Sequence, residues 1–273
     1  REHLINVYSS LALGMLAASV GSYVHMYIPI GGLLTTIASI ALIFLLFGTP
    51  DLPENSLQRK AYYYGFCFLQ GVSIGPLIDL LFFYNPEYYF FLFFSFSFPF
   101  LSFFFLFFFF SLFSFFFFFR FFFDFFSFFS FQLFHFQHSQ IFTKFSIIVK
   151  ALSSTFVVFS CFTASALLSK DRTYLYLGGF LSSAISTLLW LSFFNIFMRS
   201  ESVLNFQLYF GLLVLCGFIL YDTQLIVEKA KLGSRDYLVH ALTLFTDFFG
   251  VFIRLLAIFS KNERSNDRDR RRR

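Results

Sequence analysis

Charged residues are scarce in this sequence. Only 13% of its 273 residues are Asp, Glu, Lys or Arg, whereas 58% are hydrophobic, and the mean hydropathy is +0.74. A soluble domain usually carries about 25% charged residues, so this chain has too few charges to cover a surface in contact with water. The composition excludes an ordinary soluble globular protein and indicates a protein whose main solvent is lipid. We expect membrane lipid as a partner and no nucleic acid.

The sequence also has few residues that form disulfides or bind metals. Its three cysteines, Cys67, Cys161 and Cys216, lie in apolar runs without a Cys-x-x-Cys spacing, and we interpret them as buried small hydrophobic residues. The five histidines form no His-x-x-x-His pair, so the sequence predicts no zinc site. We expect no cofactor and no tightly bound metal.

Long apolar runs, in contrast, are abundant. A spanning helix needs about 20 apolar residues, and the runs are continuous rather than alternating, which favours helices over a β-barrel. The predicted fold is an all-α integral membrane protein with six or seven transmembrane helices in a bundle. Three spans lie in residues 1–86 and four membrane segments in residues 146–260. The expected spans are approximately Ile5–Met26, Leu33–Phe47, Ala61–Tyr84, Ile147–Leu168, Tyr174–Phe197, Leu204–Val227 and Tyr237–Phe259.

Basic residues in the short loops predict the orientation of the chain. They gather between spans two and three, four and five, and six and seven, which places the N-terminus and these loops in the cytosol. The last apolar segment contains His240, Asp247 and Arg254. It is therefore a poor lipid-facing helix, and it is either re-entrant or spans the membrane inside the bundle. The basic tail, residues 261–273, is expected to be cytosolic and disordered, and it could bind anionic lipid or an acidic partner such as calmodulin.

Residues 87–145 form an anomalous block dominated by phenylalanine, with Ser, Leu and Pro as its main companions. These four residue types can all be encoded by pyrimidines alone. We therefore hypothesise that the block is a translated non-coding insertion, such as a retained intron. The alternative is a genuine Phe-rich helical pair, but the block lacks the small residues that let helices pack closely in lipid.

Charged residues inside the spans are the candidate functional residues, because charge at membrane depth is costly. Asp222 lies near the end of the sixth expected span and Asp247 lies in the middle of the last segment. Two antiparallel helices could bring both carboxylates to one level, where they would share a proton and titrate jointly. Ionised, they could attract a divalent cation such as calcium. The alternative is that each aspartate caps a helix or pairs with a neighbour such as Arg254. Asp79 and Arg254 are auxiliary candidates.

At these residues the chain resembles the Bax inhibitor-1 family of membrane proteins. The resemblance covers nearly all of the chain outside the Phe-rich block, in order. The matching segments are residues 7–13, 23–26, 71–76, 162–167, 176–179 and 209–228, the last with the core Tyr221-Asp222-Thr223-Gln224.

The resemblance implies an endoplasmic reticulum membrane protein that crosses the membrane several times and suppresses programmed cell death under stress. It also implies a pH-sensitive calcium leak in which calcium is the permeant ion. The family's aspartate pair, its pH sensor and gate, matches Asp222 and Asp247. A basic residue that latches the closed state in bacterial relatives would fall near Arg59 or Lys60, and the family pattern has an acidic residue where Asp79 stands.

Two further hypotheses stand beside the channel. A scaffold that transports nothing could act by binding apoptosis regulators or through its basic tail. An intramembrane aspartyl protease also places two aspartates on adjacent spans, the first in a Tyr-Asp pair like Tyr221-Asp222. However, Leu244-Phe245-Thr246 precedes Asp247 instead of the Gly-x-Gly of those enzymes, and their Pro-Ala-Leu motif is absent. We therefore expect the protein not to be an enzyme.

Overall fold

The computed structural model describes residues 2–27, 33–83, 141–169, 173–198, 200–233 and 236–272. Every regular element among these residues is helical, so the predicted all-α fold is confirmed. The longer helices are α1 (Glu2–Tyr27), α2 (Leu33–Gly48), α3 (Ser56–Phe83), α6 (Ile141–Leu168), α7 (Leu177–Met198), α8 (Glu201–Lys231) and α9 (Tyr237–Arg272), with short 3-10 turns η1 (Pro53–Asn55) and η2 (Thr173–Tyr176).

Five of these helices, α1, α6, α7, α8 and α9, are long and apolar enough to cross a membrane, and α2 contains a shorter apolar stretch, Ile37–Gly48. The chain is therefore a multi-pass membrane protein. Within the Phe-rich block, residues 87–140 lie outside the described residues, and residues 141–145 form the start of α6. The interpretation of the block as a translated insertion stays a prediction.

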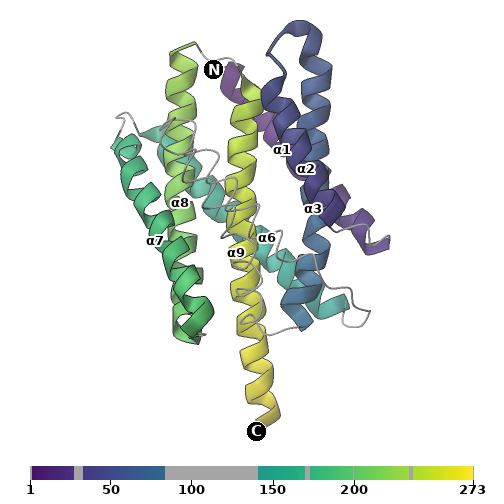
Figure 1. The fold of residues 1–273 in the computed structure, drawn as a ribbon, viewed down its shortest axis with the longest axis vertical. Coiled ribbons are helices and arrows are strands. Elements are labelled where there is room, and N and C mark those ends of the chain that lie inside the picture. Colours follow the sequence, from purple (N-terminus) through teal and green to yellow (C-terminus); the bar gives the residue numbers. More distant parts are fainter. Residues whose placement is uncertain are drawn as a thin grey trace.

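Helix α9 is the centre of the bundle. In Figure 1 it runs from the end of the bundle where the N-terminus lies to the opposite end, with α7 and α8 on one side and α1, α2 and α3 on the other. It packs against α8, α6, α1 and α3. In its apolar part 72% of the residues are buried, against 28% in α1, α6 and α7. The last segment is thus a continuous helix inside the bundle, and the re-entrant alternative is wrong.

The basic tail continues this helix. Helix α9 ends at Arg272, so the expectation of a disordered tail is wrong. Residues 261–272 contain neither Gly nor Pro, and arginine is a good helix former, so nothing in the tail interrupts the helix. The tail extends from the end of the bundle opposite the N-terminus (Figure 1). The N-terminus and the tail thus lie at opposite ends of the bundle, and the cytosolic location expected for each of them stays a prediction.

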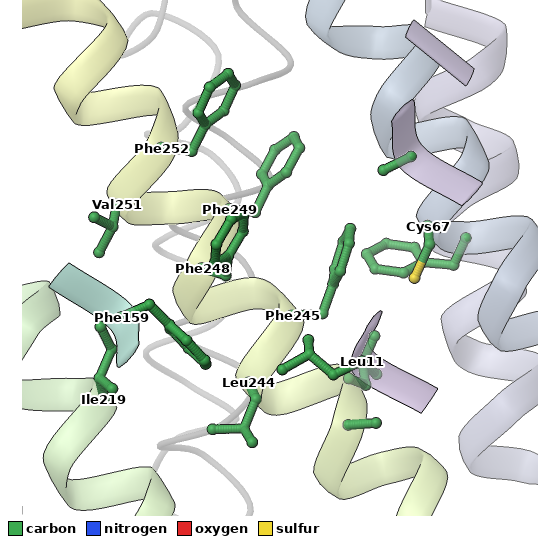
Figure 2. Close-up of a cluster of buried hydrophobic side chains, with 14 of the residues drawn as sticks. Leu11, Cys67, Phe159, Ile219, Leu244, Phe245, Phe248, Phe249, Val251 and Phe252 are labelled. Atoms are coloured by element: carbon green, nitrogen blue, oxygen red, sulfur yellow. The ribbon is translucent and has the colours of Figure 1, made fainter. Parts of the chain in front are cut away.

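Aromatic side chains of α9 fill the middle of the bundle. Figure 2 shows Phe245, Phe248, Phe249 and Phe252 among side chains from four other helices, which include Leu11, Cys67, Phe159 and Ile219. Two of these rings make edge-to-face contacts, Phe245 with Phe66 at 6.0 Å and Phe248 with Phe159 at 5.6 Å between centroids. Such pairs add stabilisation beyond that from buried area alone.

The three cysteines differ in their surroundings. Cys67 is buried in this core, Cys216 is partly buried and Cys161 is exposed on the outside of the bundle. The prediction of a buried residue is therefore correct for Cys67 and wrong for Cys161. In a membrane protein an apolar run gives little information on which side of a helix faces inward, because both lipid and protein are apolar surroundings.

Helices α1 and α3 approach each other closely because glycine stands where they cross. A Cβ atom added at Gly71 would lie 1.9 Å from the carbonyl oxygen of Ala18, and one added at Gly21 would lie 2.1 Å from that of Phe68. Small residues permit this approach of two backbones, and in lipid close packing is a principal source of helix association.

Candidate functional site: two buried aspartates and a clamp at the end of the bundle

Asp222 and Asp247 lie at the same depth on two antiparallel helices in contact. Asp222 lies nine residues before Lys231, the last residue of α8, and Asp247 lies ten residues after Tyr237, the first residue of α9. At a rise of 1.5 Å per residue, the two positions are about 13.5 and 15 Å from the helix ends that the short loop joins.

Both side chains are covered by protein. Asp222 is 5% exposed and Asp247 is fully buried. Asp247 stands among the phenylalanines of the α9 core, while Asp222 is followed by two buried polar residues, Thr223 and Gln224. The Gln224 side-chain oxygen accepts a hydrogen bond of 3.0 Å from the backbone N–H of Tyr174 in η2. An ionised carboxylate in such surroundings is costly unless another group balances its charge.

The α8–α9 connection holds the two helices in register. Gly233 has φ +95°, a conformation that other residues rarely adopt. It lies two residues after Lys231, the end of α8, and here the backbone N–H groups of Leu232 and Gly233 donate hydrogen bonds to the carbonyls of Glu228 and Ala230. The Asp236 carboxylate then accepts a hydrogen bond of 3.3 Å from the Val239 N–H and caps the start of α9. The connection is short, so it fixes how far α8 and α9 slide along each other.

Arg59 lies at the same end of the bundle and joins two loops. Its guanidinium forms ion pairs with Asp51, in the α2–α3 connection, and with Asp236. The side chain is 2% exposed, against 47% for Asp51 and 28% for Asp236. Burial disfavours the charge on Arg59, but the two carboxylates outweigh it and raise the pKa of the guanidinium. We call Asp51, Arg59 and Asp236 the end clamp.

The other predicted residues lie apart from this clamp. Lys60, the second candidate for a latch, is partly exposed. The Arg254 guanidinium donates a hydrogen bond of 3.3 Å to the Gln207 carbonyl of α8. It fits there because Gly211 has no side chain: an added Cβ would lie 2.0 Å from Arg254 Nη1. Asp79 lies in α3, but its side chain is outside the described residues.

Sequence reasoning missed both carboxylates of the clamp. Asp51 follows Pro50 in a loop and Asp236 precedes a helix, which are ordinary positions for aspartate. The N-cap position of Asp236 was a recognisable signal, but its pairing with a residue 177 positions away was not.

Among the residues that the structure describes, no group of three or more His, Cys, Asp and Glu side chains is arranged to hold a metal ion. Calcium takes six to eight oxygen ligands, so Asp222 and Asp247 alone would form an incomplete site.

The fold and these residues define a class: a helical membrane protein with several spans and two buried carboxylates, one on its central helix and one on the adjacent helix α8. The family described as "Inhibitor of apoptosis-promoting Bax1" matches residues 1–88 and 80–264 of this chain. The chain belongs to this family. The two matched segments overlap over residues 80–88, where the Phe-rich block begins.

Relatives from animals and plants match over nearly the whole chain. The sequence is 35% identical over 271 residues to "Probable Bax inhibitor 1" of Paralichthys olivaceus, an alignment that covers 98% of this chain and 90% of the relative. It is 34% identical over 273 residues to "Bax inhibitor 1" of Homo sapiens, with 99% and 90% covered. For "Bax inhibitor 1" of Arabidopsis thaliana the identity is 35% over 263 residues, with 96% and 82% covered.

Proposed function

We propose that this protein suppresses programmed cell death from the endoplasmic reticulum membrane, and that it does so as a pH-sensitive calcium leak channel or its regulator. The names of the relatives, Bax inhibitor 1, support the cell-death role. The observation that carries the calcium proposal is the placement of Asp222 and Asp247, both buried and at similar distances from the joined ends of adjacent antiparallel helices.

The aspartate pair gates the leak through its protonation state. When the pair holds a proton, one carboxyl donates a hydrogen bond to the other carboxylate, and α8 and α9 stay together. When the last proton leaves, two negative charges face each other in a low dielectric and repel strongly. The same charges attract a divalent cation to the middle of the membrane. Calcium flux therefore rises as the pH rises and falls on acidification.

The end clamp supports this gate from a distance. Arg59 holds Asp236 at the start of α9 and Asp51 in the α2–α3 connection. Since the α8–α9 connection sets the register of the two aspartate-bearing helices, Arg59 latches the closed arrangement through Asp236, without direct contact between the latch and the aspartate pair.

Calcium efflux from proteoliposomes tests the proposal. The purified full chain is compared with Asp222→Asn and Asp247→Asn between about pH 6 and pH 8. Asparagine keeps the size of the side chain but cannot ionise, so each variant should flatten the pH–flux curve. Glu54→Gln is the matched control, since Glu54 is an exposed carboxylate in η1, and it should leave the curve unchanged.

Two results would count against the channel. Unchanged pH–flux curves in both aspartate variants would remove the pair from the mechanism. A complete lack of efflux at every pH, from protein that remains folded, would favour a scaffold that protects cells without transporting calcium. Protection of cells challenged with a pro-apoptotic stimulus, measured with the same variants, separates these outcomes.

A further inference from the structure

Two histidines meet at the end of the bundle that carries the clamp. His3 lies in the first turn of α1 and His240 in the first turn of α9, 237 positions apart in the sequence. Their ring nitrogens, His3 Nε2 and His240 Nδ1, are 2.9 Å apart. The rings meet edge to face, with centroids 5.1 Å apart and planes at 83°. His240 is only 4% exposed, whereas His3 is partly exposed.

This contact depends on the number of protons that the two rings hold. A hydrogen bond between two imidazole nitrogens needs one that carries hydrogen and one that is bare, whichever tautomers supply them. If both rings are doubly protonated, two N–H groups point at each other and two positive charges lie in contact. Imidazole changes its charge between about pH 5 and pH 8. The contact is thus compatible with neutral pH and is broken by sufficient acid.

The charges around the pair link it to the end clamp. Burial disfavours the charged forms of both rings, and Lys229 also opposes charge on His240, whereas Asp236 favours charge on both histidines. Asp236 is also the partner of Arg59 and the cap of α9, and Arg59 in turn binds Asp51. On α1, Glu2 precedes His3 and is exposed. A proton on His240 creates a second cation that competes with Arg59 for Asp236.

We propose that His3 and His240 form a proton-sensitive clasp that ties the start of α1 to the start of α9 and opens on acidification. Its opening separates the start of α1 from the start of α9. The clasp is distinct from the aspartate pair, which lies about 10.5 Å further along α9, at seven residues of 1.5 Å each. It also responds to acid in the opposite sense, by opening rather than closing. It does not depend on calcium transport by the protein.

A distance measurement between two spin labels tests the clasp. The labels are attached to cysteines at Ile5, in α1, and at Leu232, beside the start of α9, both of which are exposed. The full chain is used in lipid nanodiscs, with its three native cysteines replaced and its melting temperature matched to that of the original. Pulsed dipolar spectroscopy should give a longer and broader distance distribution as the pH is lowered from 8 to about 4, and the change should reverse on neutralisation.

Two variants identify the source of the change. His3→Phe combined with His240→Phe keeps an edge-to-face ring contact but contains no titratable nitrogen, so its distance should be the same at both pH values. If the double variant does not fold, His3→Phe alone replaces it in this test, because His3 is only partly buried. Asp222→Asn combined with Asp247→Asn should keep the change. An unchanged distance in the parent chain, a change that persists without the histidines, or one that disappears with the aspartates would each overturn the proposal.

Discussion

Removing the two carboxylates of the end clamp should destabilise the protein more than removing its arginine. Arg59 is almost completely covered, at 2% exposed, whereas Asp51 and Asp236 are 47% and 28% exposed. In Asp51→Asn combined with Asp236→Asn, a buried guanidinium remains without a counter-charge. In Arg59→Met, two carboxylates remain that water can reach, and the methionine retains much of the packing of the arginine stem.

The size of each effect follows from this difference in exposure. Breaking a buried ion pair by removing one partner costs about 3–5 kcal/mol, because the other charge is left buried and uncompensated. This range applies to the loss of both carboxylates, with the lower end favoured because Arg59 lies at the end of the bundle. Exposed ion pairs contribute about 0–1 kcal/mol each. Two partly exposed pairs lost together in Arg59→Met should therefore cost about 0–2 kcal/mol.

Unfolding in mixed micelles with increasing SDS measures the free energy of unfolding for each variant. Lys231→Met is the control, since it removes a pair of 3.7 Å whose lysine is 63% exposed, and it should cost at most about 0.5 kcal/mol. An equal loss in the carboxylate and arginine variants, or a larger loss in Arg59→Met, would refute the argument that burial of the guanidinium dominates the clamp.

Two further predictions concern helix packing and the Phe-rich block. Gly71→Ala should lower the free energy of unfolding by about 1–3 kcal/mol, because its Cβ would meet the Ala18 carbonyl. Gly179→Ala, with no atom within 4 Å of the new Cβ, should be neutral or stabilising, and equal melting temperatures for the two would contradict the close contact of α1 and α3. Joining Pro86 directly to Ser146 should leave the melting temperature nearly unchanged, because α3 ends and α6 begins at the same end of the bundle (Figure 1). Loss of folding in that variant would show that the block is part of the structure.

The positions of the helices could be predicted from hydropathy because the runs are long and their breaks are clear. Each expected span lies within or close to one helix of the structure. The ends were less accurate. Helix α3 starts at Ser56 rather than Ala61, since its first turn is polar and lies before the apolar part. Hydropathy detects the lipid-soluble part of a helix, whereas hydrogen bonding continues until a cap or a breaker ends it.

The candidate site could be predicted only where a single residue was conspicuous by itself. Asp222 and Asp247 stand out because charge is rare inside apolar runs, and the short connection between their helices already indicated a common level. The end clamp and the histidine pair are different. Arg59 was a candidate only through the family resemblance, and the significance of Asp236, His3 and His240 comes from partners 177 and 237 positions away in the chain. Local patterns contain no information about such pairings.

The polar residues of α9 explain why this helix can occupy the centre. His240, Asp247, Arg254 and Lys261 recur every seven residues, which is nearly two helical turns and places them close to one face. Three of them bind partners on neighbouring helices: His240 meets His3 of α1, Arg254 meets the Gln207 carbonyl of α8, and Lys261 meets Asn205 of α8. A lipid-facing helix could not satisfy these groups, but a buried one can.

Packing of phenylalanines alone tolerates rotation and sliding of a helix, whereas polar partners at fixed depths do not. The residues that make α9 unsuitable for contact with lipid therefore set its register against α1 and α8, and this register holds Asp247 at the level of Asp222.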